Sequence, residues 1–247
     1  MIVVPSDHVI GVGPRFARTI ERAFDVAERT GALVTLGIRP TRPETGYGYI
    51  RPGARLAGAS GGTTWVDAFI EKPPLARARQ LVKGGALWNS GMFVWRVDRI
   101  LAELDRLLPD VLGPLARAAG RGGDAALARA YRRLPSVSID TGVMERAARV
   151  AVVPATFSWS DVGSWAAAGD LWRQRGPAGN ASRGRVVALD SRGCVVDSPE
   201  RLVALLGVEN LVVVDTPDAV LVCRVDRAQD VRRVVTELAR QGLGRYL

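Results

Sequence analysis

The chain contains very little of several chemically informative residue types. Among its 247 residues there is one histidine, at position 8, and there are two cysteines, at positions 194 and 223. A single imidazole excludes metal sites built from several histidines and relays that use more than one imidazole. The cysteines form no CxxC motif and no dense disulfide pattern, so we expect a reduced, cytoplasmic protein.

Long apolar runs are also missing. No run approaches the ~18 residues that span a bilayer, and the N-terminus lacks the charged flank and cleavage site of a signal peptide. The sequence therefore predicts a protein with no membrane partner.

Positive charge comes almost entirely from arginine, since lysine occurs only at Lys72 and Lys83. The formal net charge is +9, but the basic residues are scattered and form no stripe or run, so a nucleic-acid partner is not favoured. With 47% hydrophobic and 24% charged residues, the composition fits a globular protein with a sizeable core.

Strand-like and helix-like patterns alternate through the first two thirds of the chain. Buried-strand patterns occur at residues 1–5, 32–38, 64–70 and 87–97, the last with a kink at residues 89–91. Helical spacing of apolar residues occurs from Phe16 to Ala27, before Gly31, and again at residues 75–83 and 97–133, with breaks at Pro109 and residues 120–123. This alternation predicts an α/β domain with a mostly parallel sheet.

The pattern changes near residues 173–183. Beyond them come short β-type runs and then a helical segment over residues 227–241, with no clear sequence repeat. Closely spaced short strands indicate a small β-rich domain. We therefore predict a first domain over residues 1–175 and a second over residues 184–247.

Two aspartates are candidate metal ligands. Asp7 follows an apolar strand, although a turn or N-cap role is an alternative. Asp161 lies between two tryptophans in FSWSDVGSW, where Ser160 or Asp161 could instead cap the next helix. Two hard-oxygen ligands suit Mg²⁺, which takes its other ligands from phosphates and water. The spacing permits the two carboxylates to meet but does not require it.

Three further segments carry candidate polar side chains, at the end of a strand, within a strand and at a possible helix start. In FIEKP, Lys72 is a candidate phosphate-binding charge, and a surface Glu71–Lys72 pair is the alternative. In LWNSGMF, Asn89 is either a bulge residue bonded to the backbone or a reader of sugar hydroxyls. In SIDTGVME, Asp140 is a helix cap or a hydroxyl acceptor.

The segment GVGPRF, starting at Gly11, superficially resembles a phosphate-binding loop. It lacks a third glycine and leads into an ordinary amphipathic helix. We therefore interpret it as a turn with Pro14 at the helix start.

Together, the ordered segments VPSDHVI, TLGIRPTRPETGYGYI, FIEKP, LWNSGMFVW, SIDTGVME and FSWSDVGSW closely resemble bacterial mannose-1-phosphate guanylyltransferases, also called GDP-mannose pyrophosphorylases. The resemblance runs from about residue 1 through Trp165 and continues more weakly beyond it. It implies a Rossmann-like nucleotidyltransferase domain followed by a small domain similar to a left-handed β-helix. It also implies GTP and mannose 1-phosphate as substrates, and a homodimer.

The resemblance implies a role for each candidate residue. Mg²⁺ would be held by Asp7 and Asp161, and the sugar phosphate would be contacted by Lys72. Mannose would be bound by Glu71, Asn89 and Asp140 and by the backbone of Gly46 and Tyr47.

One departure from the family pattern is large, because no GxGxRLxPLS-type segment is present to surround the triphosphate. We therefore expect the N-terminus to be truncated, either by a misplaced gene start or because the chain is one piece of a split enzyme, and the isolated chain to bind GTP poorly. No cupin-like isomerase domain is evident. The alternatives are a non-catalytic sugar-phosphate-binding protein descended from the enzyme, and a nucleotidyltransferase for another sugar phosphate.

Overall fold

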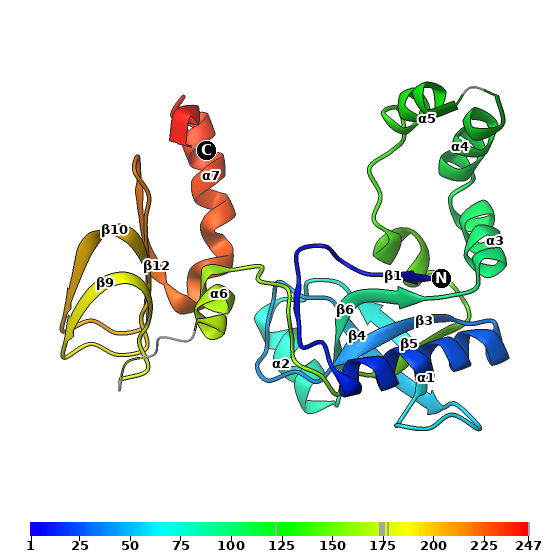
Figure 1. The fold of residues 1–247 in the computed structure, drawn as a ribbon, viewed down its shortest axis with the longest axis horizontal. Helices are drawn as coiled ribbons and strands as arrows, with labels where there is room; N and C mark the ends of the chain where they lie inside the picture. The colour runs from blue at the N-terminus through cyan, green and yellow to red at the C-terminus, as the bar shows by residue number, and fades with distance from the viewer. Residues whose placement is uncertain (122, 173–175, 177, 247) are drawn as a thin grey trace. The chain divides into compact units, whose positions relative to one another are not determined.

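The computed structural model of the chain describes residues 1–121, 123–172, 176 and 178–246 (Figure 1). The contacts divide it into two compact units. Unit 1 comprises Met1–Ser6 and Ile10–Trp159, and unit 2 comprises Asp7–Val9 and Ser160–Leu247. Part of the predicted transition segment, residues 173–175 and 177, lies outside the described residues. Each unit is described by itself.

Unit 1 contains a six-stranded sheet in the order β1-β6-β3-β7-β5-β4. The strands are β1 (Ile2–Val3), β3 (Leu33–Ile38), β4 (Tyr49–Arg55), β5 (Thr64–Ile70), β6 (Leu87–Val94) and β7 (Val150–Pro154). Among the described residues of this six-stranded sheet, only β3 and β7 pair in parallel, and the other pairings are antiparallel. The prediction of a mostly parallel sheet was therefore wrong.

Short connections explain the antiparallel pairing. Strands β4 and β5 form a hairpin around the predicted turn at residues 58–62, and such a turn is too short for the crossover that parallel neighbours need. The predicted kink in β6 is confirmed, because the register with β3 shifts between Thr35 and Gly37. The start of β6 also pairs with β4, so Trp88 lies between Ile38 on one strand and Tyr49 on the other.

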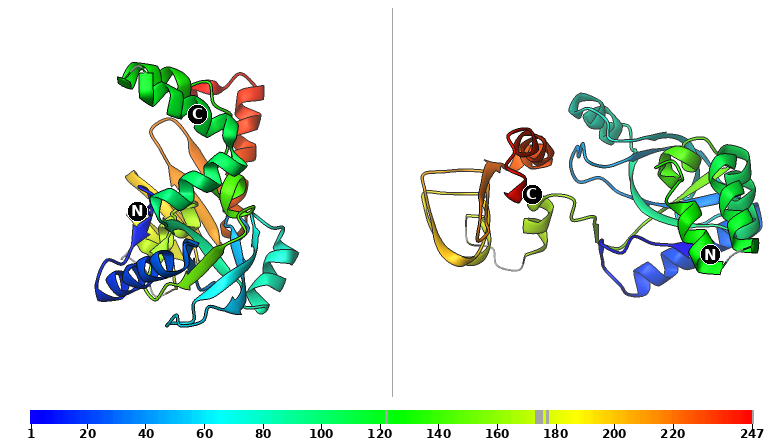
Figure 2. Two further views of the ribbon diagram at one scale, coloured as in Figure 1. Left: turned by 90° about the vertical axis from the view of Figure 1, so that its right-hand side faces the viewer. Right: turned by 90° about the horizontal axis from the view of Figure 1, so that it is seen from above.

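The helix α1 (Pro14–Thr30) runs along one face of this sheet (Figures 1 and 2). It begins at Pro14, with Gly13 as N-cap, and ends at Gly31, whose φ of 63° is left-handed, as predicted for both ends. Its buried face packs on β3 and β7 in a continuous core that includes the residues Ala23, Val26, Ala27, Val34, Leu36, Ala151 and Val153.

The remaining helices of unit 1 follow the predicted breaks. They are α2 (Leu75–Lys83), α3 (Val97–Leu107), α4 (Pro109–Arg121) and α5 (Gly123–Tyr131). A single π-helical turn, η1 (Asp140–Met144), follows them and packs against a second core around Phe93, Trp95 and Ile100. Its first residue is Asp140, one of the candidate site residues.

A separate two-stranded sheet pairs β2 (Val9–Ile10) with β8 (Trp159–Ser160). The backbone N–H of Gly11 also donates to the Ser158 carbonyl at 2.8 Å. This small sheet brings together two chain segments that are far apart in the sequence.

Unit 2 contains a four-stranded sheet in the order β12-β11-β10-β9. Its elements are α6 (Trp165–Leu171), β9 (Ala181–Leu189), β10 (Val195–Leu206), β11 (Leu211–Asp215), β12 (Val220–Arg224), the 3₁₀ turns η2 (Val225–Asp230) and η3 (Gly244–Tyr246), and α7 (Val231–Arg240). Strands β9, β10 and β11 are parallel and β12 is antiparallel. The predicted β-rich region and the helix after it are confirmed.

Arginine–aspartate pairs link the parallel strands of unit 2. Arg183 donates to both carboxylate oxygens of Asp197, at 2.7 and 2.6 Å, and Arg201 donates to Asp215 at 2.9 Å. Both pairs join residues 14 positions apart. The structure therefore contains a repeated cross-strand arrangement that was not apparent in the sequence.

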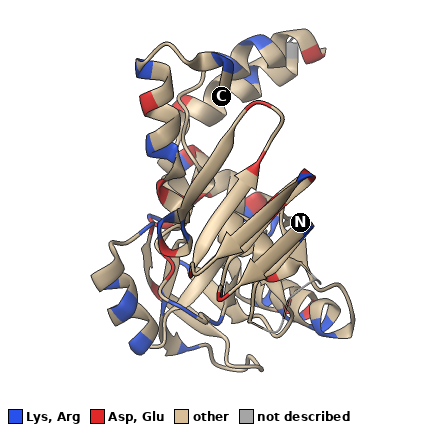
Figure 3. Cartoon of the chain, turned by 90° about the vertical axis from the view of Figure 1, so that its left-hand side faces the viewer, with Lys and Arg blue, Asp and Glu red and all other residues tan. Residues whose placement is uncertain are grey.

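Charged residues of both signs lie close together on the helices (Figure 3). Ion pairs such as Arg29–Asp25 at 2.8 Å and Arg106–Glu103 at 2.6 Å account for part of this distribution. Among the described residues, no helix combines the length and the apolar character needed to cross a bilayer.

Candidate functional site

A hydrogen bond between Asn89 and Asp140 forms the centre of the candidate sugar site in unit 1. The Asn89 amide nitrogen donates to Asp140 Oδ1 at 2.7 Å. The Thr35 hydroxyl donates to the Asn89 amide oxygen at 3.1 Å, and the Gly91 backbone N–H reaches the same oxygen at 3.3 Å. Asn89 is therefore both a bulge residue bonded to the backbone and a partner of Asp140, and its amide is oriented from both ends.

The Glu71–Lys72 pair follows strand β5. Lys72 Nζ donates to Glu71 Oε1 at 2.7 Å, with 53% of the lysine side chain and 33% of the glutamate side chain exposed. Glu71 and Lys72 therefore do form the surface ion pair that was the alternative interpretation of this segment. Lys72 also has a φ of 43°, a left-handed conformation that is uncommon for a non-glycine residue and is often found at functional sites.

Gly48 allows the loop before β4 to approach both groups closely. An added Cβ at Gly48 would lie 2.6 Å from Glu71 Oε2 and 3.5 Å from Asn89 Cβ. The Gly48 carbonyl accepts the Asn89 backbone N–H at 2.8 Å. The loop backbone, Glu71 and Asn89 are therefore packed together, and a side chain at position 48 would push the glutamate away.

The two neighbouring residues predicted to contribute through their backbone have distinct surroundings. The Gly46 N–H donates to Glu44 Oε1 at 3.2 Å, so this amide already has a carboxylate partner. The Tyr47 side chain is buried and packs edge-to-face on Trp88 and Trp159, with ring centroids 4.9 and 5.4 Å away. These aromatic contacts fix the loop that leads to Gly48.

Two acidic side chains near Asn89, those of Asp140 and Glu145, have raised pKa values. Burial raises the pKa of Asp140, and the charge of Glu71 raises it further, while the Asn89 hydrogen bond acts in the opposite direction. Burial and the charges of Glu71 and Asp140 likewise raise the pKa of Glu145. We call Glu71, Asp140 and Glu145 the acid cluster. The π-turn contributes to it, since the Glu145 N–H donates to the Asp140 carbonyl at 2.9 Å.

Asp7 and Asp161 both belong to unit 2 and flank the small β2–β8 sheet. Asp7 precedes β2 by two residues, and Asp161 directly follows β8. The Asp7 side chain is 83% exposed, with its Oδ1 3.8 Å from His8 Nε2. Asp161 Oδ1 accepts the Gly163 N–H at 2.9 Å. Each of the two predicted metal ligands therefore lies close in sequence to a strand of the same small sheet.

The alternative that Ser160 or Asp161 caps the next helix was wrong. Helix α6 begins at Trp165, and its N-cap is Ser164, whose hydroxyl accepts the Ala167 N–H at 3.2 Å. Val162, which lies between Asp161 and Ser164, has a left-handed φ of 52°, which is strained for a β-branched residue. The backbone around Asp161 is therefore held in an unusual conformation that helix capping does not explain.

By residue type, Asp7 and Asp161 are compatible with a magnesium ion that takes its other ligands from substrate. Among the described residues, no group of three or more histidine, cysteine, aspartate or glutamate side chains could hold a metal by itself. Mg²⁺ is commonly bound by one or two carboxylates together with phosphate oxygens and water. Two aspartates such as Asp7 and Asp161 supply hard oxygen ligands of that kind.

Sequence reasoning missed three contributors to the sugar site. Thr35 is a buried strand residue that no motif distinguishes, and its role appears only from its bond to Asn89. Glu145 lies within the SIDTGVME segment, but no role was predicted for it from the sequence. Gly48 was detectable, because a glycine that alternates with aromatic residues in TGYGY often marks a close backbone approach.

Comparisons with known proteins identify the families that the two parts of the chain match. The nucleotidyl transferase family matches residues 1–174, and the mannose-phosphate isomerase/GMP-like β-helix domain matches residues 184–238. These matches confirm the predicted fold, a nucleotidyltransferase domain followed by a β-helix-like domain.

Individual relatives are similar over nearly the whole chain. The xanthan biosynthesis protein XanB of Xanthomonas campestris is 45% identical over 98% of this chain and 51% of its own length. A mannose-1-phosphate guanylyltransferase of Klebsiella pneumoniae is 40% identical over 100% of this chain and 53% of its own length. A Thermus thermophilus crystal structure, described as a mannose-1-phosphate geranyltransferase, has a TM-score of 0.83 and 40% identity, covering 96% of this chain and 69% of that one. The chain thus spans about half the length of these curated relatives.

Proposed function

This chain belongs to the nucleotidyl transferase family, and on that basis we propose that the protein is a mannose-1-phosphate guanylyltransferase. The observation that carries the proposal is the Asn89–Asp140 hydrogen bond, with Glu71 and Lys72 packed beside it against Gly48. Such a set of oriented acceptors and donors beside one lysine suits a sugar phosphate. The names of the relatives support mannose 1-phosphate and GTP as the substrates.

In the proposed reaction, a phosphate oxygen of mannose 1-phosphate attacks the α-phosphorus of GTP. A new P–O bond forms, the bond to the β-phosphate breaks, and pyrophosphate leaves with that electron pair. The nucleophile is already an anion at neutral pH, so no general base is needed. Catalysis then consists mainly of positioning and charge neutralisation.

Each residue has a separate part in this proposal. Lys72 contacts the sugar phosphate and offsets its charge. The mannose hydroxyls donate to Glu71 and Asp140 and exchange hydrogen bonds with Asn89, while the backbone at Gly46 and Tyr47 lines the pocket. Asp7 and Asp161 would hold Mg²⁺, which when bound supplies further neutralisation at the phosphates.

The two predicted domains, residues 1–175 and 184–247, are part of the proposal. So are the homodimer and the cytoplasmic location, the latter supported by the free cysteines Cys194 and Cys223.

The two lysines provide a matched test. Pyrophosphate release should be measured with the product of the complete gene, over pairs of nucleoside triphosphate and sugar 1-phosphate. We expect GTP with mannose 1-phosphate to be the best pair, and Lys72→Ala to reduce kcat/KM by ~10²-fold or more. The control Lys83→Ala, which removes the other lysine from the last turn of α2, should leave kcat/KM unchanged. Equal losses in both variants, or no turnover with any pair, would contradict the proposal.

A further inference from the structure

Two cavities in unit 1 contain none of the residues assigned above to the sugar or the metal. The first, of about 570 Å³, is lined by Arg18, Glu21, Arg22, Asp25 and Thr156. The second, of about 530 Å³, also includes Thr156, together with Arg39, Thr64 and mainly apolar or glycine residues. They are neighbours through the segment that follows β7.

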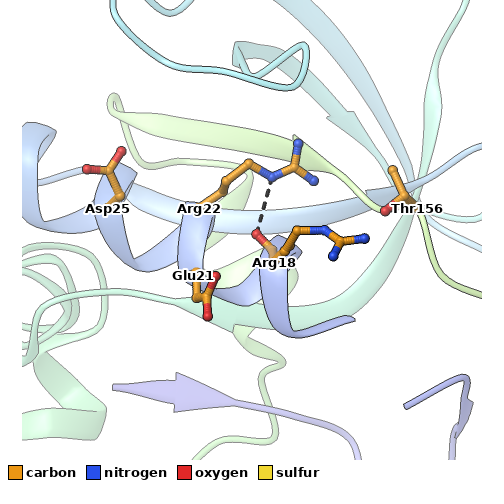
Figure 4. A pocket seen from close by; sticks show the side chains of 5 residues that line it. All are labelled: Arg18, Glu21, Arg22, Asp25 and Thr156. Atoms are coloured by element: carbon orange, nitrogen blue, oxygen red, sulfur yellow. Dashed lines mark hydrogen bonds between the residues drawn. The ribbon is translucent and has the colours of Figure 1, made fainter. Parts of the chain in front are cut away.

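The first cavity has a basic side and an acidic side. Figure 4 shows the guanidinium groups of Arg18 and Arg22 pointing toward Thr156, while the carboxylates of Glu21 and Asp25 point in other directions. Asp25 is also engaged by Arg29, which donates to its two oxygens at 2.9 and 2.8 Å. The space between α1 and Thr156 is therefore bordered by two positive charges.

Contacts with its own helix and a nearby turn hold Arg22 in this orientation. Its Nε donates to the Arg18 carbonyl at 3.3 Å and its Nη2 donates to the Thr19 hydroxyl at 3.3 Å. A Cβ added to Gly61 would lie 1.7 Å from Arg22 Nη1, so the guanidinium packs directly against that glycine. The Arg22 side chain is therefore already ordered, so binding a ligand would cost it little further conformational entropy.

Arg18 still has its hydrogen-bonding capacity. Among the described residues its side chain has no hydrogen-bond or ion-pair partner, and it lies one helical turn from Arg22. The planar donor arrangement of a guanidinium group matches the oxygens of a phosphate. The Thr156 hydroxyl lies on the opposite side as a further donor.

We propose that Arg18, Arg22 and Thr156 form a binding site for a phosphoryl group, separate from the proposed sugar-nucleotide chemistry. The shared chemistry of the ligand is a dianionic phosphate held by paired guanidinium groups. Its source is either a free phosphate, including pyrophosphate, or a phosphate ester whose organic part enters the neighbouring cavity beside Leu87 and Phe157.

Calorimetric titration tests this site directly. Pyrophosphate, inorganic phosphate and phenyl phosphate are titrated into the protein at constant ionic strength, with EDTA and no Mg²⁺. We expect saturable binding of at least one ligand and a ~10-fold or greater loss of affinity in Arg18→Gln/Arg22→Gln. Tighter binding of phenyl phosphate identifies an ester, and tighter binding of the inorganic anions identifies a free phosphate.

Two control variants distinguish binding at this site from binding elsewhere on the protein. Arg77→Gln/Arg79→Gln removes the same charge from exposed positions of α2 and should change the affinity less than ~2-fold. Lys72→Ala should also bind normally, whether or not the proposed transferase activity exists. No saturable binding, an equal loss in both arginine variants, or abolition by Lys72→Ala would each overturn the proposal.

A milder substitution covers the case in which the double variant does not fold. Thr156→Val removes only the exposed hydroxyl and should weaken binding by ~3-fold with an unchanged melting temperature. Unchanged affinity in Thr156→Val would remove Thr156 from the site, and unchanged affinity in the single variant Arg18→Gln as well would refute the site.

Discussion

Carboxylates with shifted or paired charges have opposite surroundings in the two units. In unit 2, Asp197 is held by Arg183, and Asp215 accepts hydrogen bonds from Ser198 at 2.8 Å and Arg201 at 2.9 Å. These bonds lower the pKa of Asp215, with that from Ser198 contributing most. In the acid cluster of unit 1, by contrast, burial and neighbouring acids raise the pKa of Asp140 and Glu145.

This difference separates structural acids from candidate functional ones. An acid that is bonded to arginine and hydroxyl partners in the folded state stabilises that state. An acid cluster whose members disfavour each other's charge lowers stability in the free protein. Groups of the second kind concentrate where a ligand supplies the missing partners, which is consistent with sugar hydroxyls reaching Asp140.

The largest expected effect concerns Asp161, another acid of unit 2. Asp161→Asn should reduce nucleotidyl transfer by ~10³-fold or more, because one metal-binding carboxylate is removed. Asp190→Asn, at an exposed position of the same unit, should leave the rate unchanged. Steady-state assays over a range of Mg²⁺ concentrations measure both, and near-normal Mg²⁺-dependent turnover in Asp161→Asn would refute the metal assignment.

The next effect concerns Asn89, which donates a hydrogen bond to the acid cluster at Asp140. Asn89→Ala removes the donor to Asp140 and the proposed partner of a sugar hydroxyl, so KM for mannose 1-phosphate should rise by ~10–100-fold. KM for GTP serves as the internal control and should stay the same. Equal increases in both constants would indicate a general loss of structure rather than a sugar contact.

An effect on stability is expected in unit 2. Asp215→Asn should lower the midpoint of thermal unfolding at neutral pH by roughly 3–6 °C. Because the folded-state pKa of Asp215 is lowered, its stabilisation is present above the unfolded-state pKa and is lost as pH falls through the folded-state pKa. The melting curves of variant and wild type should therefore converge in acid, and a constant difference at all pH values would argue against the charged pairing.

The smallest effect has the opposite sign. The folded-state pKa of Asp140 is raised, so its ionised form is penalised above that pKa and the penalty disappears as pH falls through it. Asp140→Asn should therefore slightly raise the unfolding midpoint at neutral pH, with the gain vanishing in acid. A lower midpoint at neutral pH would place Asp140 among the structural acids and end the contrast between the units.

The sequence predicted those features that depend on local pattern. The ends of α1 were predictable because Pro14 and Gly31 have fixed conformational preferences, and α2 follows from apolar spacing up to Gly84. Strand direction was not predictable in this way, since pairing depends on contacts between distant segments. A buried strand such as β3 has the same apolar pattern whether its neighbour runs parallel or antiparallel.

The candidate sugar site shows the same division. Glu71, Lys72, Asn89 and Asp140 were identified from motifs at a strand end, within a strand and at a possible helix start. The orientation of Asn89 by Thr35 could not be read from the sequence, because the two residues are 54 positions apart. Likewise, the raised pKa of Glu145 depends on a π-turn that no residue pattern in SIDTGVME distinguishes from ordinary helix.

The triple pairing of β6 has a consequence for how the chain acquires its structure. This strand pairs with β1, β3 and β4, and the pairing of Ile2 with Val94 closes one of the longest loops in unit 1. None of these ladders can form before residues 87–94 have left the ribosome. Long-range pairings of this kind slow folding, because loop-closure entropy is lost before many contacts are gained. The three ladders of β6 should thus form only after this strand emerges, which leaves the pairing edges of β6's partners available for misassembly during that interval of synthesis.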